Sequence, residues 1–130
     1  MSYASQASAY REREVLTASP ARLVVLVFQH AHSHLLRARH AVKTNNVQER
    51  VAAVGKARDA VMELMATLNM EEGGQIAQNL RSLYAFILTE LSDVARRPDG
   101  ARLEAIIRIV SDLHDAFAAV AMDSARIPAA

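Results

Sequence analysis

Residues 17–28 read Thr-Ala-Ser-Pro-Ala-Arg-Leu-Val-Val-Leu-Val-Phe, a helix start signal followed by six consecutive apolar side chains. Ser19 is a good N-cap, because its hydroxyl can accept a backbone N–H of the first turn, and Pro20 at the first helical position loses no hydrogen bond. At about 100° per residue, the apolar run occupies the whole circumference, whereas a surface helix usually has one apolar stripe. The stretch predicts a helix with more apolar surface than one core contact needs, and the surplus suggests a partner.

Three more helical patterns follow the first, which is expected over residues 20–43. The chain has only four Gly and three Pro, and no alternating β-branched run appears, so long helices are favoured. The turn signals Thr44-Asn45-Asn46, Gly73-Gly74 and Pro98-Asp99-Gly100 delimit predicted helices at residues 47–68, 74–95 and 101–122. Short connections between helices of similar length favour antiparallel neighbours. The sequence predicts an all-α fold, an antiparallel up-and-down four-helix bundle with an extended N-terminal strap.

Each predicted helix carries apolar residues at spacings typical of a bundle core. The first two sets are Val24, Phe28, Ala31, Leu35, Ala38 and Val42, and Val47, Val51, Val54, Val61, Leu64 and Leu68. The other two are Ile76, Leu80, Leu83, Ile87, Leu91 and Val94, and Leu103, Ile106, Val110, Leu113, Phe117 and Val120. We expect these side chains to fill the core.

The predicted bundle, residues 19–122, is flanked by segments without this periodicity. Residues 1–18 contain Tyr3, Tyr10, Val15 and Leu16. They are either a mobile terminus, as chain ends often are, or a strap that lies over apolar surface. Residues 123–130 are predicted to be a frayed C-terminal tail.

Length and composition narrow the class of protein. The chain has 130 residues, which predicts one domain that buries roughly two thirds of its unfolded surface without a disulfide or metal. It has no cysteine, which excludes disulfides, thiol catalysis and Cys-based zinc sites. The longest apolar run is far shorter than the roughly 20 residues that span a bilayer, and no export signal begins the chain. We expect a soluble, cytoplasmic protein that does not insert into a membrane.

Charge gives no general reason for nucleic-acid binding, because the net charge is +1. Its distribution is uneven, since no Asp or Glu lies between Val15 and Gln48. The basic residues there are Arg22, Arg37, Arg39 and Lys43, with four of the five histidines. We interpret this asymmetry as charge pairing inside the bundle rather than as a phosphate site.

No arrangement of residues predicts catalysis or a metal site. His30 and His34 lie one helical turn apart and could project together. However, His32 points to the opposite side, and no Glu-x-x-His pair completes a carboxylate-bridged centre. There is no nucleophile elbow and no phosphate-binding loop. The histidines are read as a groove edge or as solvated imidazoles, and neither a cofactor nor enzyme activity is expected.

Apolar residues beyond the core positions mark a candidate partner surface. These are Leu23, Leu26 and Val27 on the first predicted helix, and Ala77, Tyr84, Phe86 and Leu88 on the third. Two neighbouring helices that each carry a second apolar stripe beside the core stripe can form a groove for an amphipathic peptide. A generously packed core also widens the stripes, so both interpretations stay open on the residues alone.

A series of motifs runs in order along residues 10–120. It comprises Tyr10, Thr17-Ala18-Ser19-Pro20 with Leu23, then Phe28, Ala31 and Arg37-Ala38-Arg39, then Leu68-Asn69, Glu72-Gly73-Gly74-Gln75-Ile76-Ala77-Gln78-Asn79-Leu80, Leu83-Tyr84 and Ile87. This series resembles the FliS family of flagellin export chaperones. The Thr-Ala-Ser-Pro start and the Gly-Gly block are specific in combination.

The resemblance implies a cytoplasmic helical bundle without enzymatic activity. Such a protein binds the disordered C-terminal segment of flagellin, prevents premature polymerisation and delivers the client to the flagellar export machinery. The resemblance also implies that the N-terminal segment covers part of the binding groove until the client arrives. The expected partner-binding residues are Tyr10, Val15, Leu23, Val27, Ile76, Leu80, Leu83, Tyr84 and Ile87. The alternative is a structural helical-bundle homo-oligomer, such as a homodimer, in which the surplus apolar surface serves self-association.

Overall fold

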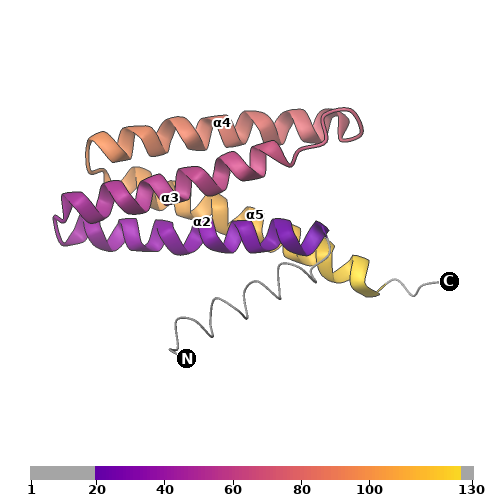
Figure 1. Ribbon diagram of the computed structural model, residues 1–130, viewed down its shortest axis with the longest axis horizontal. Helices are drawn as coiled ribbons and strands as arrows, with labels where there is room; N and C mark the ends of the chain where they lie inside the picture. Colours follow the sequence, from indigo (N-terminus) through magenta and orange to yellow (C-terminus); the bar gives the residue numbers. More distant parts are fainter. Residues whose placement is uncertain (1–19, 127–130) are drawn as a thin grey trace, which may run out of the picture.

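The computed structural model describes residues 20–126, which form four helices and no strand. The helices are α2 (Pro20–Lys43), α3 (Val47–Ala66), α4 (Gly74–Arg96) and α5 (Gly100–Arg126). They lie side by side in alternating directions, with short connections at each end (Figure 1). The predicted all-α four-helix bundle is confirmed. The expected strap, the Ser19 cap and residues 127–130 lie outside the described residues.

The helices pack in a ring in which α2 plays the largest part. α2 packs against both α3 and α5, and α3 also packs against α4, whereas α4 and α5 meet over a much smaller area. The ring of Phe28 on α2 lies 6.4 Å from that of Tyr84 on α4 and 5.1 Å from that of Phe117 on α5. These centroid distances are in the range of favourable aromatic pairs. Phe28 therefore joins three of the four helices.

The core differs from the predicted one at four positions. Val47, Val51, Ile76 and Val120 were expected to be buried, but 48 to 72% of each residue's surface is exposed. In α3 the buried face combines the predicted Val54, Val61 and Leu64 with three alanines, Ala53, Ala57 and Ala60. Ile76 and Val120 lie near the ends of their helices, where there are fewer neighbours. Val25 and Ala41 are fully buried in α2, while Val24 and Val42 pack only partly against the core.

The turn between α2 and α3 forms where Thr44-Asn45-Asn46 predicts it. Asn45 has a φ of 54°, in the left-handed region, which asparagine tolerates better than most residues. The N–H of Asn46 donates to the carbonyl of Ala41 at 2.9 Å, and that of Asn45 to Val42 at 3.3 Å, which is the Schellman pattern. The Asn46 side chain then accepts from the N–H of Glu49 at 3.0 Å and caps α3.

The two glycines before α4 are required for different reasons. Gly74 has a φ of 54°, where a side chain is strained. At Gly73 a Cβ would lie 2.6 Å from both the Ala77 Cβ and the Asn69 carbonyl oxygen. Asn69 stabilises the same turn, because its side chain accepts from the N–H of Glu72 at 3.0 Å. The turn is therefore built by local chemistry and brings α4 back along α3.

At the opposite end of the bundle, Arg50 of α3 is only 7% exposed, and its Nη2 donates to the carbonyl of Ala95 at 3.2 Å. Ala95 lies in the last turn of α4, where carbonyls lack a partner within the helix and a positive charge is favourable. Arg50 thus fastens the start of α3 to the end of α4.

The fourth helix extends beyond its predicted end. α5 begins at Gly100, where the Asp99 side chain accepts from the N–H of Arg102 at 3.0 Å. It continues to Arg126 instead of ending at residue 122. No Gly or Pro lies between residues 101 and 127, so nothing in the sequence stops the helix earlier.

Replacing Gly73 by Ala is expected to lower the free energy of unfolding by about 1–3 kcal/mol, because the new Cβ displaces backbone in the turn. Gly55, within α3, is the matched control, since a Cβ there would meet nothing within 4 Å. Gly55→Ala should raise stability by about 1 kcal/mol through helix propensity. Urea denaturation of both variants measures the two effects. Equal stability of Gly73→Ala and the natural chain would contradict the tight turn.

The stability of the bundle should also depend on the ionisation of Tyr84. Burial raises the pKa of Tyr84 to about 12 from its ordinary 10.0. Between these values the unfolded chain loses the phenol proton while the folded chain keeps it, so the free energy of unfolding falls as pH rises, by up to roughly 3 kcal/mol. Denaturation at pH 9 to about pH 12 should show a steeper fall for the natural chain than for Tyr84→Phe. Parallel curves would show that this phenol is not protected.

Candidate partner-binding groove

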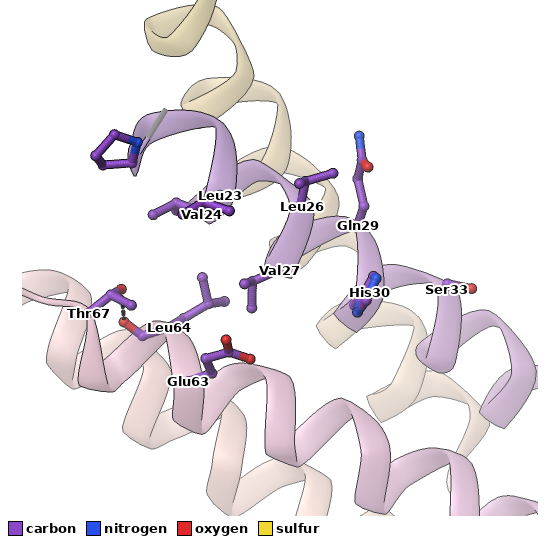
Figure 2. Close-up of a pocket in the computed structure, with 11 residues that line it drawn as sticks. Leu23, Val24, Leu26, Val27, Gln29, His30, Ser33, Glu63, Leu64 and Thr67 are labelled. Carbon is purple, nitrogen blue, oxygen red and sulfur yellow. Dashed lines mark hydrogen bonds between the residues drawn. The ribbon is translucent and has the colours of Figure 1, made fainter. Parts of the chain in front are cut away.

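A groove of about 750 Å³ lies between the start of α2 and the end of α3. Its lining residues are Pro20, Leu23, Val24, Leu26, Val27, Gln29, His30 and Ser33 of α2, and Glu63, Leu64 and Thr67 of α3. Val27 and Leu64 face one another across it (Figure 2). Most of the side chains that line it are apolar, so it is suited to take apolar groups from a partner.

The floor and the rim of this groove differ in how firmly they are held. Leu64 is 1% exposed and belongs to the buried core, against which Val24 and Val27 also pack. Leu23 and Leu26 are partly exposed and do not belong to this packing. The core therefore fixes the floor, while the two leucines offer apolar surface that the bundle does not use.

Few polar groups of the groove are free to fix a ligand. The Thr67 hydroxyl donates to the Leu64 carbonyl at 2.7 Å, so it is used within α3. The Gln29 amide lies 3.4 Å from the ring of His114 on α5. Glu63 and His30 face the groove from opposite walls, and neither forms an ion pair within 4 Å with a described side chain. Apolar contact is therefore the main interaction that this groove can offer a ligand.

Of the nine residues expected to bind a partner, two line this groove, Leu23 and Val27. The α4 residues are placed elsewhere: Leu80 and Leu83 pack partly against the core, Tyr84 and Ile87 are 2% and 1% exposed, and Ile76 is 72% exposed. Tyr10 and Val15 lie outside the described residues. The sequence analysis paired the first predicted helix, α2, with the third, α4. The second wall of this groove is instead provided by the second predicted helix, α3.

Sequence reasoning missed Glu63 and Thr67 and assigned Leu64 only to the core. A signal for them exists, because a short turn joins α2 and α3 as antiparallel neighbours. That connection places the last turn of α3 beside the first turns of α2. Counting back from the Asn45-Asn46 turn would have paired the two segments.

The histidines near the groove do not gather into a metal site. Among the described residues no group of three or more His, Asp or Glu side chains could hold a metal ion. The pKa of His34 lies below its usual 6.5, chiefly because of burial and then because of the positive charges of Arg37, His30 and Lys56. This imidazole therefore favours its neutral form. No helix in the described part of the chain has the length and apolar character needed to cross a membrane.

The family model described as "Flagellar protein FliS" matches residues 2–124. The chain belongs to the FliS family. It is 33% identical over 107 residues to the flagellar secretion chaperone FliS of Salmonella typhimurium, covering 82% of this chain and 79% of that one. The corresponding protein of Vibrio cholerae is 28% identical over 106 residues, with 82% and 78% covered. That of Escherichia coli is 28% identical over 107 residues, with 82% and 79% covered.

Proposed function

We propose that this FliS-family protein is a cytoplasmic flagellar export chaperone that binds the disordered C-terminal segment of flagellin. In this role it prevents premature polymerisation and delivers the client to the export apparatus. The observation that most supports the proposal is the apolar groove, with Leu23 and Leu26 partly exposed at its rim. The named relatives are flagellar secretion chaperones, which supports the same class of function.

Binding of a disordered client is an exchange of entropy for buried surface. The client loses conformational freedom when it orders, and such complexes typically recover this by burying on the order of 1,000 to 3,000 Å². A groove whose floor is fixed by the core adds little ordering cost of its own. Leu23, Leu26 and Val27 follow helical spacing, so they can interdigitate with an amphipathic helix. Binding of this kind requires no catalytic group.

The N-terminal segment, residues 1–18 with Tyr10 and Val15, is proposed to cover the groove before the client arrives. Pro20 supports this, because the first described residue lines the groove and the segment therefore joins the bundle there. A covering segment would keep the partly exposed Leu23 and Leu26 from non-specific association. The client would displace it on binding.

Leu26→Asp is expected to weaken binding of the flagellin C-terminal segment at least about tenfold, because it places a charge in an apolar contact. Its melting temperature should stay close to that of the natural chain, since Leu26 does not pack against the core. Met62→Asp is the control, because Met62 is 53% exposed on α3 and does not line the groove. Calorimetric titration and thermal melting measure both variants.

Equal affinities of the Leu26→Asp and Met62→Asp variants would argue against the groove as the client site. Light scattering distinguishes the alternative, a structural homo-oligomer. A monomer that forms a one-to-one complex with the flagellin segment supports the chaperone, whereas a stable dimer that ignores the segment supports the alternative.

A further inference from the structure

The outward face of α2 changes in character along its length. Its first half lines the apolar groove. Its second half lines another hollow of about 430 Å³, formed by Ser33, Leu36, Arg37 and His40 with Glu49 of α3. Ser33 lines both hollows, so they are neighbours on one continuous helix face.

Two basic side chains, Arg37 and His40, line the second hollow. α2 contains no Asp or Glu in its 24 residues. Arg37 of α2 and Lys56 of α3 are both near enough to His34 to act on its charge. Arg37, His40 and Lys56 are called the cationic strip below.

The permanent charges of this strip form no ion pair within 4 Å with a described side chain. Arg39, on the neighbouring face of α2, pairs with Glu104 of α5 at 3.2 Å. By contrast, Arg37 and Lys56 form no ion pair within 4 Å with a described side chain. Glu49 lines the second hollow, and it also forms none. Among the residues that line the second hollow, Glu49 is thus the one carboxylate beside Arg37 and His40, and Lys56 adds a second permanent cation near His34.

We propose that the outward face of α2 recognises a peptide segment in two parts, apolar side chains in the groove and at least one Asp or Glu on the cationic strip. This inference rests on the proposed chaperone function and adds the chemistry of the client segment. Leu23 and Arg37 are fourteen residues apart on α2, which is about 21 Å along a helix. A helical client therefore carries its acidic residue about fourteen positions from its apolar anchor.

Two features favour a peptide over a nucleic acid on this face. The cationic strip directly adjoins an apolar groove, whereas a phosphate backbone needs a track of repeated positive charges. Glu49 and Glu63 line the two hollows and would repel a continuous polyanion. A single acidic side chain can avoid both carboxylates.

The size of the effect follows from the exposure of these groups. Solvent-exposed ion pairs contribute little to affinity, and more to specificity and to the rate of association. We therefore expect discrimination of about three- to tenfold between acidic and basic segments at low salt. Discrimination should weaken as salt screens the charges.

The test uses two synthetic peptides of about 24 residues that share leucines at helical spacing. At the end away from the leucines, one peptide carries glutamates and the other carries lysines. Fluorescence anisotropy with the full chain should show tighter binding of the glutamate peptide. The double variant Arg37→Glu/Lys56→Glu should reverse this preference. The control double variant Arg81→Glu/Arg108→Glu changes the net charge by the same amount at exposed positions of α4 and α5. This control should keep the preference for the glutamate peptide. Thermal melting checks that each variant is folded.

Several outcomes would overturn the inference: equal binding of the two peptides, binding of neither, reversal in the control variant, or tighter binding of a single-stranded oligonucleotide than of the glutamate peptide. Titration with the flagellin C-terminal segment tests the proposed function separately. If the chain prefers the glutamate peptide but ignores flagellin, the recognition surface stands and the proposed client is wrong. If flagellin binds and the peptides are not distinguished, the client stands and the two-part recognition is wrong.

Discussion

Close packing between α2 and α3 is the contact on which the rest of the bundle depends. These two helices make the most extensive contact of any pair, and the buried cluster contains Ala31 and Ala38 of α2 with Ala53, Ala57 and Ala60 of α3. Small side chains allow two helix backbones to approach closely. Near the start of α2, where the groove lies, the larger residues Val27 and Leu64 face one another (Figure 2).

Residues whose role is decided by local chemistry could be predicted from the sequence. The turn at Asn45-Asn46 and the glycines at 73 and 74 lie where expected, because a positive φ, a side-chain cap and a missing Cβ each require particular residue types. The number, order and direction of the helices followed from these turns. Helix ends were less accurate, as α5 shows, since no breaking residue marks its end.

Residues whose role depends on tertiary packing were predicted less well. Alanine gives a weak hydrophobic signal, so Val47 and Val51 were preferred over Ala53, Ala57 and Ala60, which contribute to the buried face of α3. Likewise, Leu64 serves both the core and the groove floor, and a pattern of residue types cannot separate the two roles. The partly exposed Leu23 and Leu26 were recognisable because the start of their helix has apolar residues all round. The identity of the opposite wall was not, because it depends on which helices are neighbours.

The contact between α4 and α5 is the least extensive contact between neighbouring helices of the ring. Near the turn that joins them, the guanidinium of Arg102 lies 2.8 Å from Glu90, 3.1 Å from Asp93 and 3.8 Å from Asp99. Farther along, Phe86 and Val120 remain more than half exposed. These ion pairs hold the two helices together near the turn that joins them. Local opening costs the least free energy where few apolar contacts have to be broken. Separation of α4 from α5 would therefore break fewer contacts than separation of either helix from its other neighbour.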